Sequence, residues 1–391
     1  MRLPVPHGGP GEAGIMKFLT LCAMACGLLF GPRCNAQALQ SGPDSWPIFR
    51  GDGGLTGASA AAIKLPLVLR WTWRDPDAVL TAPVISEEKV LVGSTTGTVV
   101  CLSAAAGKIL WSSAAGAAVE GAPVIDGSAV YVGTSAGKVM RLDLARGKVR
   151  WEFATGGRIA GSPNVQRRGA DSTVIVGSYD GSLYALDART GKLRWSFPTG
   201  NFINGTAAVT GNLAAFGGCD ARLHLLSIPD GVEVASVDTG SYIPGSPAAV
   251  GGRLYVGNYA NKVLAVDLAT GNTVWTYSTD RAGSAFFSSP AVGAGVVVIG
   301  CRDGRVHCVD QRSGRLRWTW EAGGEVDSSP VIADSVVITG SGDGRLVLLS
   351  LSDGKECWSY DLGDPLRGSA AAAAGLVVAS SEGGIVRAFG E

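Results

Sequence analysis

A segment of about forty residues repeats through most of the chain, and this repeat constrains the fold more than any other feature. A typical copy contains a Ser-Pro segment, an apolar run ending in Gly, a tight turn, an alternating run ending in Asp, and Gly-x-x-x-Trp. The tryptophan position is occupied by Trp71, Trp111, Trp151, Trp195, Ala235, Trp275, Trp318 and Trp358, in steps of 40, 40, 44, 40, 40, 43 and 40 residues. Eight phased copies predict units that bury their faces against one another.

Each copy predicts four short β-strands, which we call strands A to D. In residues 161–195, strand A follows the Ser-Pro, strand B ends at Gly177, strand C ends at Asp187 and strand D carries Trp195. Asp-Gly between strands B and C is typical of a hairpin turn, and the frequent Val, Thr and Tyr favour strands. No long segment has the apolar spacing of an amphipathic helix. We therefore predict an all-β fold, an eight-bladed β-propeller with four-stranded blades.

The two ends of the repeat are complementary. After Trp358 the chain supplies strands A, B and C of a last copy and ends at Glu391, whereas "LVLRWTW" at residues 67–73 has the pattern of an isolated strand D. We expect this N-terminal strand to complete the last blade, which closes the ring and removes open sheet edges. The predicted organisation is an upstream extension and signal peptide (1–38), a lead-in (39–65) and the propeller (66–391).

The first 38 residues predict export. Lys17 precedes the short apolar core "FLTLCAMACGLLF", and small residues follow as cleavage sites after Ala36 or Ala38. This core is too short to cross a bilayer. Cys26 could carry a lipid anchor, although Ala23 stands where such signals usually have a branched apolar residue. The expected location is periplasmic or extracellular.

Charge excludes several classes of partner. Lys plus Arg and Asp plus Glu both number 33, the net charge is +0, and no basic run of five residues occurs. Nucleic-acid binding and polybasic membrane attachment both need clustered positive charge and are not expected.

Five cysteines, Cys101, Cys219, Cys301, Cys308 and Cys357, follow the predicted signal peptide. Their odd number and their scatter over different copies do not indicate a disulfide framework. Cys301 and Cys308 flank one hairpin turn and could pair, although small buried apolar positions are the favoured interpretation.

Two segments with the pattern Ala-x-Asp-x-x-Thr-Gly-x-x-x-Trp carry a family resemblance: "ALDARTGKLRW" ending at Trp195 and "AVDLATGNTVW" ending at Trp275. Together with "SWPIFRGDGGLTG" at residues 45–57, they resemble the quinoprotein-type (PQQ-like) propeller repeats over roughly residues 46–390. The resemblance implies that the Gly permits the C–D turn and that the Trp packs between blades. Enzymes and non-enzymes share this motif, so it implies no activity by itself.

Two branches of that family lead to different expectations. The quinone-dependent alcohol dehydrogenases have adjacent cysteines over the cofactor, a calcium site and a catalytic Asp, whereas this chain has no adjacent Cys pair. The chain is also similar to the BamB-type propellers, non-catalytic scaffolds of outer-membrane barrel assembly. The length of the chain, its predicted signal peptide and its short loops favour this second branch.

Few residues offer catalytic chemistry. His224 and His307, the two histidines beyond the signal peptide, each lie in a strand C among apolar residues, which favours packing positions over a zinc site or a catalytic triad. The Asp-Gly turns supply fewer oxygen ligands than a calcium loop needs. We expect no cofactor and no metal, with PQQ plus calcium as the alternative.

The loop from strand D into the next strand A contains one position that varies between copies. The position before it is apolar throughout: Val79, Val119, Ile159, Ile203, Ile243, Phe286, Val326 and Leu366. The variable position holds Leu80, Glu120, Ala160, Asn204, Pro244, Phe287, Asp327 and Arg367. The fold does not fix these residues, so they are either freely solvated or part of a ligand ring at the channel mouth. The candidate ring is Glu120, Asn204, Phe287, Asp327 and Arg367, with Arg158, Tyr242 and Glu325 one step further out.

The first functional interpretation is a non-catalytic binding module whose D–A and B–C loops meet a protein or an envelope polymer. The alternative is a PQQ-dependent dehydrogenase-like oxidoreductase that uses the channel mouth as a cofactor cradle. A third, weaker interpretation is a hydrolase or lyase with Glu120 or Asp327 as acid or base. The ring supplies Arg158 and Arg367 against three acids, a poor match for the three carboxylates of PQQ, so tight PQQ binding is not expected.

Overall fold

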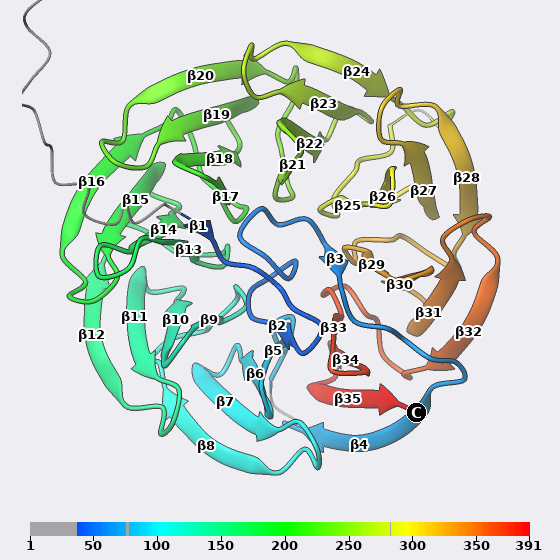
Figure 1. Ribbon diagram of the computed structural model, residues 1–391, viewed down its shortest axis with the longest axis horizontal. Helices are drawn as coiled ribbons and strands as arrows, with labels where there is room; N and C mark the ends of the chain where they lie inside the picture. The colour runs from blue at the N-terminus through cyan, green and yellow to red at the C-terminus, as the bar shows by residue number, and fades with distance from the viewer. Residues whose placement is uncertain (1–36, 76–77, 282) are drawn as a thin grey trace, which may run out of the picture. The chain divides into compact units, whose positions relative to one another are not determined.

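The computed structural model describes residues 37–391 except 76–77 and 282, and it consists of strands arranged as blades around a central axis (Figure 1). The predicted signal-peptide core and Cys26 lie outside the described residues. Within the described residues, we find no helix with the length and apolar character needed to cross a membrane.

The first four blades follow one another along the chain, each with strands A to D in order. Blade 1 contains β5 (Val84–Ser86), β6 (Lys89–Gly93), β7 (Thr98–Ser103) and β8 (Ile109–Ala114). Blade 2 contains β9 (Val124–Asp126), β10 (Ala129–Gly133), β11 (Lys138–Asp143) and β12 (Val149–Ala154). Blade 3 contains β13 (Asn164–Arg167), β14 (Thr173–Gly177), β15 (Ser182–Asp187) and β16 (Leu193–Pro198). Blade 4 contains β17 (Ala208–Thr210), β18 (Leu213–Gly217), β19 (Arg222–Ser227) and β20 (Glu233–Asp238).

The other four blades complete the circle. Blade 5 contains β21 (Ala248–Val250), β22 (Arg253–Gly257), β23 (Val263–Asp267) and β24 (Thr273–Tyr277). Blade 6 contains β25 (Ala291–Gly293), β26 (Val296–Cys301), β27 (Arg305–Asp310) and β28 (Leu316–Glu321). Blade 7 contains β29 (Val331–Ala333), β30 (Val336–Gly340), β31 (Arg345–Ser350) and β32 (Glu356–Asp361). Blade 8 contains β33 (Ala371–Ala373), β34 (Leu376–Ser381), β35 (Ile385–Gly390) and the N-terminal β4 (Val68–Arg74).

The predicted closure of the ring is confirmed. Strand β4 pairs antiparallel with β35, with Trp71 opposite Ala388, so the N-terminal strand is the outer strand of the last blade (Figure 1). This pairing leaves β35 with a neighbour on both edges.

The repeated tryptophan joins the blade to the next one in seven of the eight blades, and blade 4 has Ala235 in its place. The Nε1–H of Trp195 donates to the carbonyl oxygen of Ile228 in the following blade at 2.7 Å, and Trp71 bonds Ala104 in the same way at 2.7 Å. The indole of Trp195 lies against Gly231, where an added Cβ would be 2.6 Å from ring atom Cδ2. Gly231 also has φ +72°, so both crowding and backbone conformation require glycine there.

The aspartates that end the C strands bind the C–D turns, as the sequence predicts. Asp187 accepts hydrogen bonds from the backbone N–H and the hydroxyl of Thr190 at 2.8 and 2.7 Å. Arg194 donates to its other oxygen at 2.9 Å. Burial raises the pKa of Asp187, but these bonds outweigh that effect and lower the pKa to about 2.

Residues 37–59, which comprise the end of the predicted signal-peptide segment and the first part of the lead-in, cross the central channel and add a fifth strand to three blades, where the sequence predicts only four strands per blade (Figure 1). Strands β1 (Gln37–Ala38) and β2 (Ser45–Trp46) pair antiparallel with β13 and β5, and β3 (Ala58–Ser59) pairs parallel with β29. We call residues 37–59 the plug. Its side chains Leu39, Trp46, Ile48 and Leu55 are buried.

A buried arginine anchors the plug. Arg50 donates to the carbonyl oxygens of Ser329 and Pro290, both at 3.1 Å, and so joins the plug to blades 6 and 7. Burial lowers the pKa of Arg50 to about 9, partly offset by the charge of Asp52. On the other side of the channel, the amide of Asn164 donates to the carbonyl oxygen of Gly53 at 2.8 Å.

Candidate functional site

The D–A loops surround a pit of about 270 Å³ at the mouth of the channel. Its wall is formed by residues that precede the A strands, and Phe49 contributes from the plug. Hydroxyl groups in the wall link neighbouring blades, because each accepts a hydrogen bond from the equivalent backbone N–H of the blade before. The bonds run from Ser162 to Thr206, Thr206 to Ser246, Ser246 to Ser289 and Ser289 to Ser329, at 2.8 to 2.9 Å.

The glycines of this wall are explained by crowding between blades. A Cβ on Gly121 would lie 2.5 Å from the carbonyl oxygen of Gly161, and a Cβ on Gly161 would lie 2.6 Å from that of Gly205. Their small size is therefore a requirement of the ring and does not by itself indicate a phosphate or cofactor cradle.

Three members of the candidate ring, Glu120, Asn204 and Phe287, line the pit. The other five, Arg158, Tyr242, Glu325, Asp327 and Arg367, do not line it, and we describe their contacts below.

The apolar position next to this ring is buried in seven copies, but the first copy departs from the expected alignment. Val79 is 46% exposed and Leu80 is buried in its place. The hydrogen bonds give the reason, since Thr95 N–H bonds the carbonyl of Val79 just as Ser135 N–H bonds that of Ala118. The first loop is therefore offset by one residue, and Leu80 does not occupy the variable position.

The charges of the ring are neutralised by neighbours. Glu120 pairs with Arg158 at 2.6 Å, and Arg367 lies 3.4 Å from Glu382. Each pair joins groups of opposite charge, so the described charged residues of the ring form no cluster of one sign.

Arg302 makes the other ion pairs of the ring. Arg302 donates two hydrogen bonds of 2.8 Å to the carboxylate of Asp327, and its Nε is 3.6 Å from an oxygen of Glu325. The bidentate arginine occupies one acceptor site on each oxygen of Asp327 and holds the carboxylate in place, as expected for a structural ion pair.

Aromatic side chains gather on the same loops over blades 3 to 6, and we call Tyr179, Phe202, Tyr242, Tyr259 and Phe287 the aromatic arc. Tyr179 and Phe202 stack with ring centroids 5.0 Å apart. Tyr259 contacts Phe287 edge-on at 5.0 Å and Tyr242 at 6.5 Å. Phe202, Tyr242 and Tyr259 are each about half exposed, at 49%, 53% and 46%.

Two arginines lie on the rings of the aromatic arc. The Cζ of Arg302 is 3.5 Å from the centroid of Phe287, and the Cζ of Arg158 is 5.1 Å from that of Tyr179. Such cation–π contacts hold the guanidinium groups flat against the surface.

Sequence reasoning missed Tyr179, Tyr259 and Arg302, which begin the B–C turns. The sequence contained a usable signal, because the equivalent positions vary just as the D–A position does: Thr95, Ser135, Tyr179, Cys219, Tyr259, Arg302, Gly342 and Glu382. The structure explains why they belong to the same surface. The N–H of each bonds a D–A loop carbonyl, as Tyr179 bonds Arg158 at 2.8 Å and Tyr259 bonds Tyr242 at 3.0 Å.

Both predicted packing histidines are hydrogen-bonded within their blades. His224 contacts Asp220 and Glu233 at 2.7 and 2.6 Å. His307 is buried, and its Nε2 contacts the Asp303 carboxylate at 3.1 to 3.2 Å.

The five described cysteines are unpaired. Cys308 lies opposite Val298 and Cys301 lies opposite Arg305, so the two are out of register for a disulfide across the hairpin. Burial raises the pKa of each of these two thiols to about 12.

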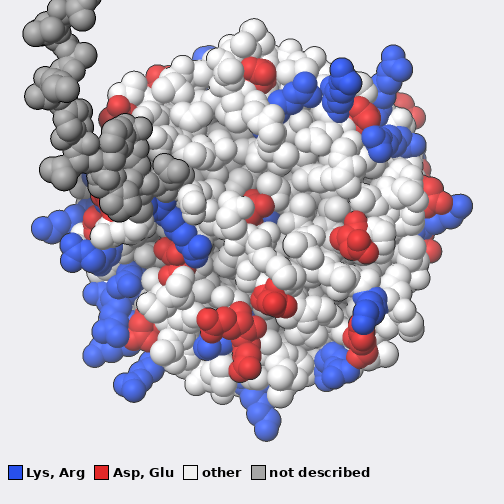
Figure 2. All heavy atoms as spheres, viewed as in Figure 1, with Lys and Arg blue, Asp and Glu red and all other residues white. Residues whose placement is uncertain are grey.

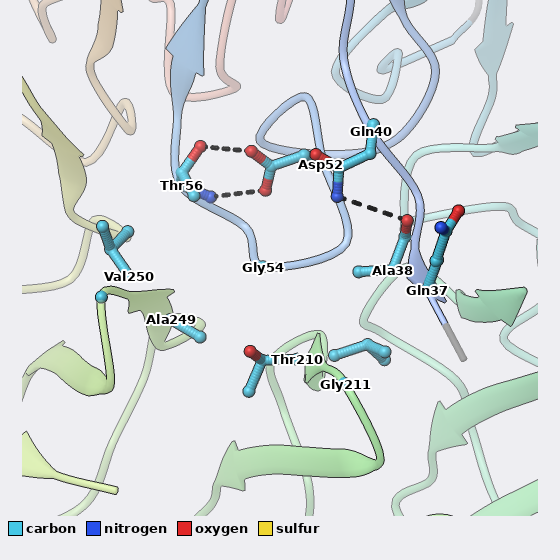
Figure 3. A pocket seen from close by; sticks show the side chains of 12 residues that line it. Gln37, Ala38, Gln40, Asp52, Gly54, Thr56, Thr210, Gly211, Ala249 and Val250 are labelled. Carbon is cyan, nitrogen blue, oxygen red and sulfur yellow. Dashed lines mark hydrogen bonds between the residues drawn. The ribbon is translucent and has the colours of Figure 1, made fainter. Parts of the chain in front are cut away.

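A second hollow, of about 540 Å³, lies where the plug meets the A–B turns of blades 4 and 5 (Figure 3). Asp52 borders it, but Thr56 donates to both of its oxygens, from the backbone N–H at 3.0 Å and from the hydroxyl at 2.5 Å. Burial raises the pKa of Asp52 despite these bonds. The carboxylate of Asp52 therefore stabilises the turn of the plug through its bonds to Thr56.

The residues of the pit do not match the demands of PQQ. Among the described residues that line the pit, Glu120 has a charged side chain and none is Lys or Arg. Three carboxylates of a quinone cofactor would enter a wall of hydroxyls, glycines and one acid. Outside the pit, on the face that Figure 2 shows, Lys and Arg lie mainly toward the outer edge and are interspersed with Asp and Glu.

Eight radial blades with interblade tryptophans and an N-terminal strand closing the last blade define a PQQ-like β-propeller. A family model described as outer membrane protein assembly factor BamB matches residues 70–210, 169–319 and 302–390. The chain belongs to this family.

Two similar proteins are each named outer membrane protein assembly factor BamB. The one from Nitrosomonas eutropha is 31% identical over 103 residues, which is 26% of this chain and 24% of that protein. The one from Xanthomonas campestris pv. campestris is 36% identical over 87 residues, 20% of this chain and 21% of that protein. The matches thus span about a quarter or less of these relatives.

Solved structures share the fold. BamB from Moraxella catarrhalis superposes with a TM-score of 0.70 at 22% identity, covering 83% of this chain and 98% of that one. The quinohemoprotein alcohol dehydrogenase from Comamonas testosteroni gives 0.75 at 14% identity, covering 89% and 80%. The architecture is therefore compatible with both an assembly factor and an enzyme, and the residues of the loops must distinguish between these two functions.

Proposed function

We propose that this chain is a non-catalytic scaffold of outer-membrane protein assembly that binds a protein partner through the aromatic arc. Family membership supports the assembly role, since the family description and both named relatives carry it. The proposed location is the periplasmic side of the outer membrane, reached through the predicted signal peptide.

The aromatic arc is the observation that carries this proposal. Half-exposed Phe202, Tyr242 and Tyr259 lie on loops whose backbones are hydrogen-bonded to one another. Tyrosine, other aromatic residues and arginine are enriched where protein interfaces concentrate their binding energy. Rings that already stack lose little conformational freedom on binding, which favours affinity.

We also propose that the pit does not bind PQQ, with or without calcium. The described residues that line the pit include no Lys or Arg to bind the carboxylates of the cofactor, and Glu120, the acid among them, already pairs with Arg158. Titration of the purified protein with PQQ and calcium, followed by calorimetry, tests this directly. Stoichiometric binding at micromolar or tighter affinity would contradict the scaffold proposal and favour the oxidoreductase.

Site-specific photo-crosslinking tests the proposed surface. A photoreactive amino acid replaces Tyr242 in the aromatic arc, and a control replaces Val232, an equally exposed apolar residue in the C–D turn of blade 4. Adducts formed in the native envelope are identified by mass spectrometry. We expect a component of the outer-membrane assembly machinery at Tyr242 and not at Val232.

Substitutions measure the contribution of the arc. The pair Phe202→Ala and Tyr242→Ala should weaken the captured complex at least tenfold, whereas Leu193→Ala, also half exposed, should leave it unchanged. Equal adducts at Tyr242 and Val232, or an adduct with a sugar polymer in place of a protein, would contradict the proposal.

A further inference from the structure

Blades 3, 4 and 6 share a pairing in which an Asp of the B–C turn binds the residue four positions later in strand C. The pairs are Asp180 with Tyr184, Asp220 with His224 and Asp303 with His307. The first two pairs show that this contact can serve packing alone. Blade 6 differs because a thiol joins the pair.

Cys301, Asp303 and His307 form a buried cluster of three metal-ligating groups. One ligand atom from each, Sγ, a carboxylate oxygen and an imidazole nitrogen, lies within 4.8 Å of the other two. The side chains of Asp303 and His307 have no exposed surface, and Cys301 is also buried. Three different ligand types that converge in the interior are uncommon for packing, because apolar residues would fill the same space without polar atoms.

We propose that Cys301, Asp303 and His307 bind one divalent transition-metal ion of the Zn²⁺ type. Sulfur, nitrogen and carboxylate oxygen are the donors that Zn²⁺ takes in proteins, at about 2.0–2.3 Å. Ligand nitrogen and oxygen atoms in such a tetrahedron lie roughly 3.3 Å apart, close to the observed 3.1 Å between His307 Nε2 and Asp303. One thiolate and one carboxylate balance the charge of the ion in the interior.

The surroundings of the cluster fit a metal site. His307 Nε2 faces Asp303, while Nδ1 lies 2.9 Å from the hydroxyl of Tyr277. That contact fixes the ring and leaves Nε2 for the ion, as outer partners of ligating histidines usually do. The carbonyl oxygen of Ala285 lies 3.5 Å from Cys301 Sγ and accepts a hydrogen bond from the backbone N–H of Arg302 at 3.0 Å.

The cluster lies under the D–A loop that is three residues longer than the regular repeat. Arg281 of this loop donates to the carbonyl oxygen of Asp303, and Phe286 packs edge-on against His307 at 5.6 Å. The ion would thus tie the longer loop to blade 6. Because Phe287 follows Phe286, the metal would also position one residue of the aromatic arc, although the site does not depend on the proposed function.

Cobalt substitution tests the site in the full-length exported protein. The protein is unfolded with a chelator, refolded with Co²⁺ and examined by absorption spectroscopy, and native Zn²⁺ is measured by elemental analysis. A thiolate ligand gives a near-ultraviolet charge-transfer band, and four-coordinate Co²⁺ gives intense visible bands. We expect about one ion per chain and both signatures.

Two cysteine variants separate ligation from packing. Cys301→Ser should abolish the charge-transfer band, whereas Cys308→Ser, equally buried in the same hairpin but outside the cluster, should keep it. His307→Gln should lose the ion, and His224→Gln should retain it. If Cys301→Ser fails to fold, the wild-type spectrum and metal content still decide. Substoichiometric metal, no thiolate band, or equal bands in both cysteine variants would overturn the proposal.

Discussion

The missing tryptophan of blade 4, at Ala235, predicts a stabilising substitution. At six of the other tryptophan positions an indole fills the space beside a glycine of the next blade, but the Cβ of Ala235 stands 3.8 Å from the position that a Cβ on Gly271 would take. The carbonyl of Leu268 lies 33 positions after Ala235, the same separation as between Trp195 and its acceptor Ile228. An indole at residue 235 therefore has both a groove and a hydrogen-bond acceptor.

The expected gain from Ala235→Trp is modest. Burying about 200 Å² of indole surface at about 25 cal/mol per Å² is worth about 5 kcal/mol. Ordering the side chain costs about 1 kcal/mol, and fitting it beside the partly buried Val237 and Leu268 costs about 1–3 kcal/mol. The net change in unfolding free energy should be a stabilisation of about 1–3 kcal/mol.

Urea denaturation followed by circular dichroism measures this change. Trp195→Ala provides the mirror-image control, because it opens a cavity over Gly231 and removes the bond to Ile228, at a cost of about 3–5 kcal/mol. If Ala235→Trp loses more than about 2 kcal/mol, blade 5 has closed the groove by repacking, and the reasoning from the repeat is wrong.

Two further predictions concern closure and pH. Deleting residues 67–73 should lower the denaturation midpoint far more than deleting residues 37–45, because only the first deletion exposes an edge of β35. Thermal melts followed by circular dichroism compare the two variants. Equal losses in both would contradict the closure of blade 8 by the N-terminal strand. Asp187 has its pKa lowered to about 2 from an unfolded value of about 3.9, so its stabilising effect is present above pH 4 and is lost as the pH falls through about 2. Asp187→Asn should therefore flatten the acid loss of stability in that range, measured by urea midpoints at each pH, and the exposed Asp334→Asn should not.

Sequence alone predicted the blade count, the strand order within a blade and the N-terminal strand that closes blade 8, and the family resemblance implied the interblade role of the tryptophans. These features depend on short-range patterns, a period of two along each strand and fixed turn residues, which recur in every copy. The repetition makes the prediction possible, because the structural role of Trp195 or Gly231 could not be inferred from one copy of the repeat.

The plug and the aromatic arc were decided by tertiary structure. The lead-in has no period, and its anchor Arg50 bonds Ser329, 279 residues away, so no local pattern could place it. The candidate ring was only partly predicted, because its charges pair with B–C residues such as Arg302 that the D–A alignment did not include.

The cluster of Cys301, Asp303 and His307 shows the same division between sequence and structure. Its residues are close in the chain, yet the sequence could not show that they converge, because neighbours in a strand point to opposite faces and a turn reorients them. Sequence determined which blade each residue belongs to. The packing of the two strands, the turn between them and the longer D–A loop determined that the three side chains meet. Only the packed blade fixes the direction of each side chain.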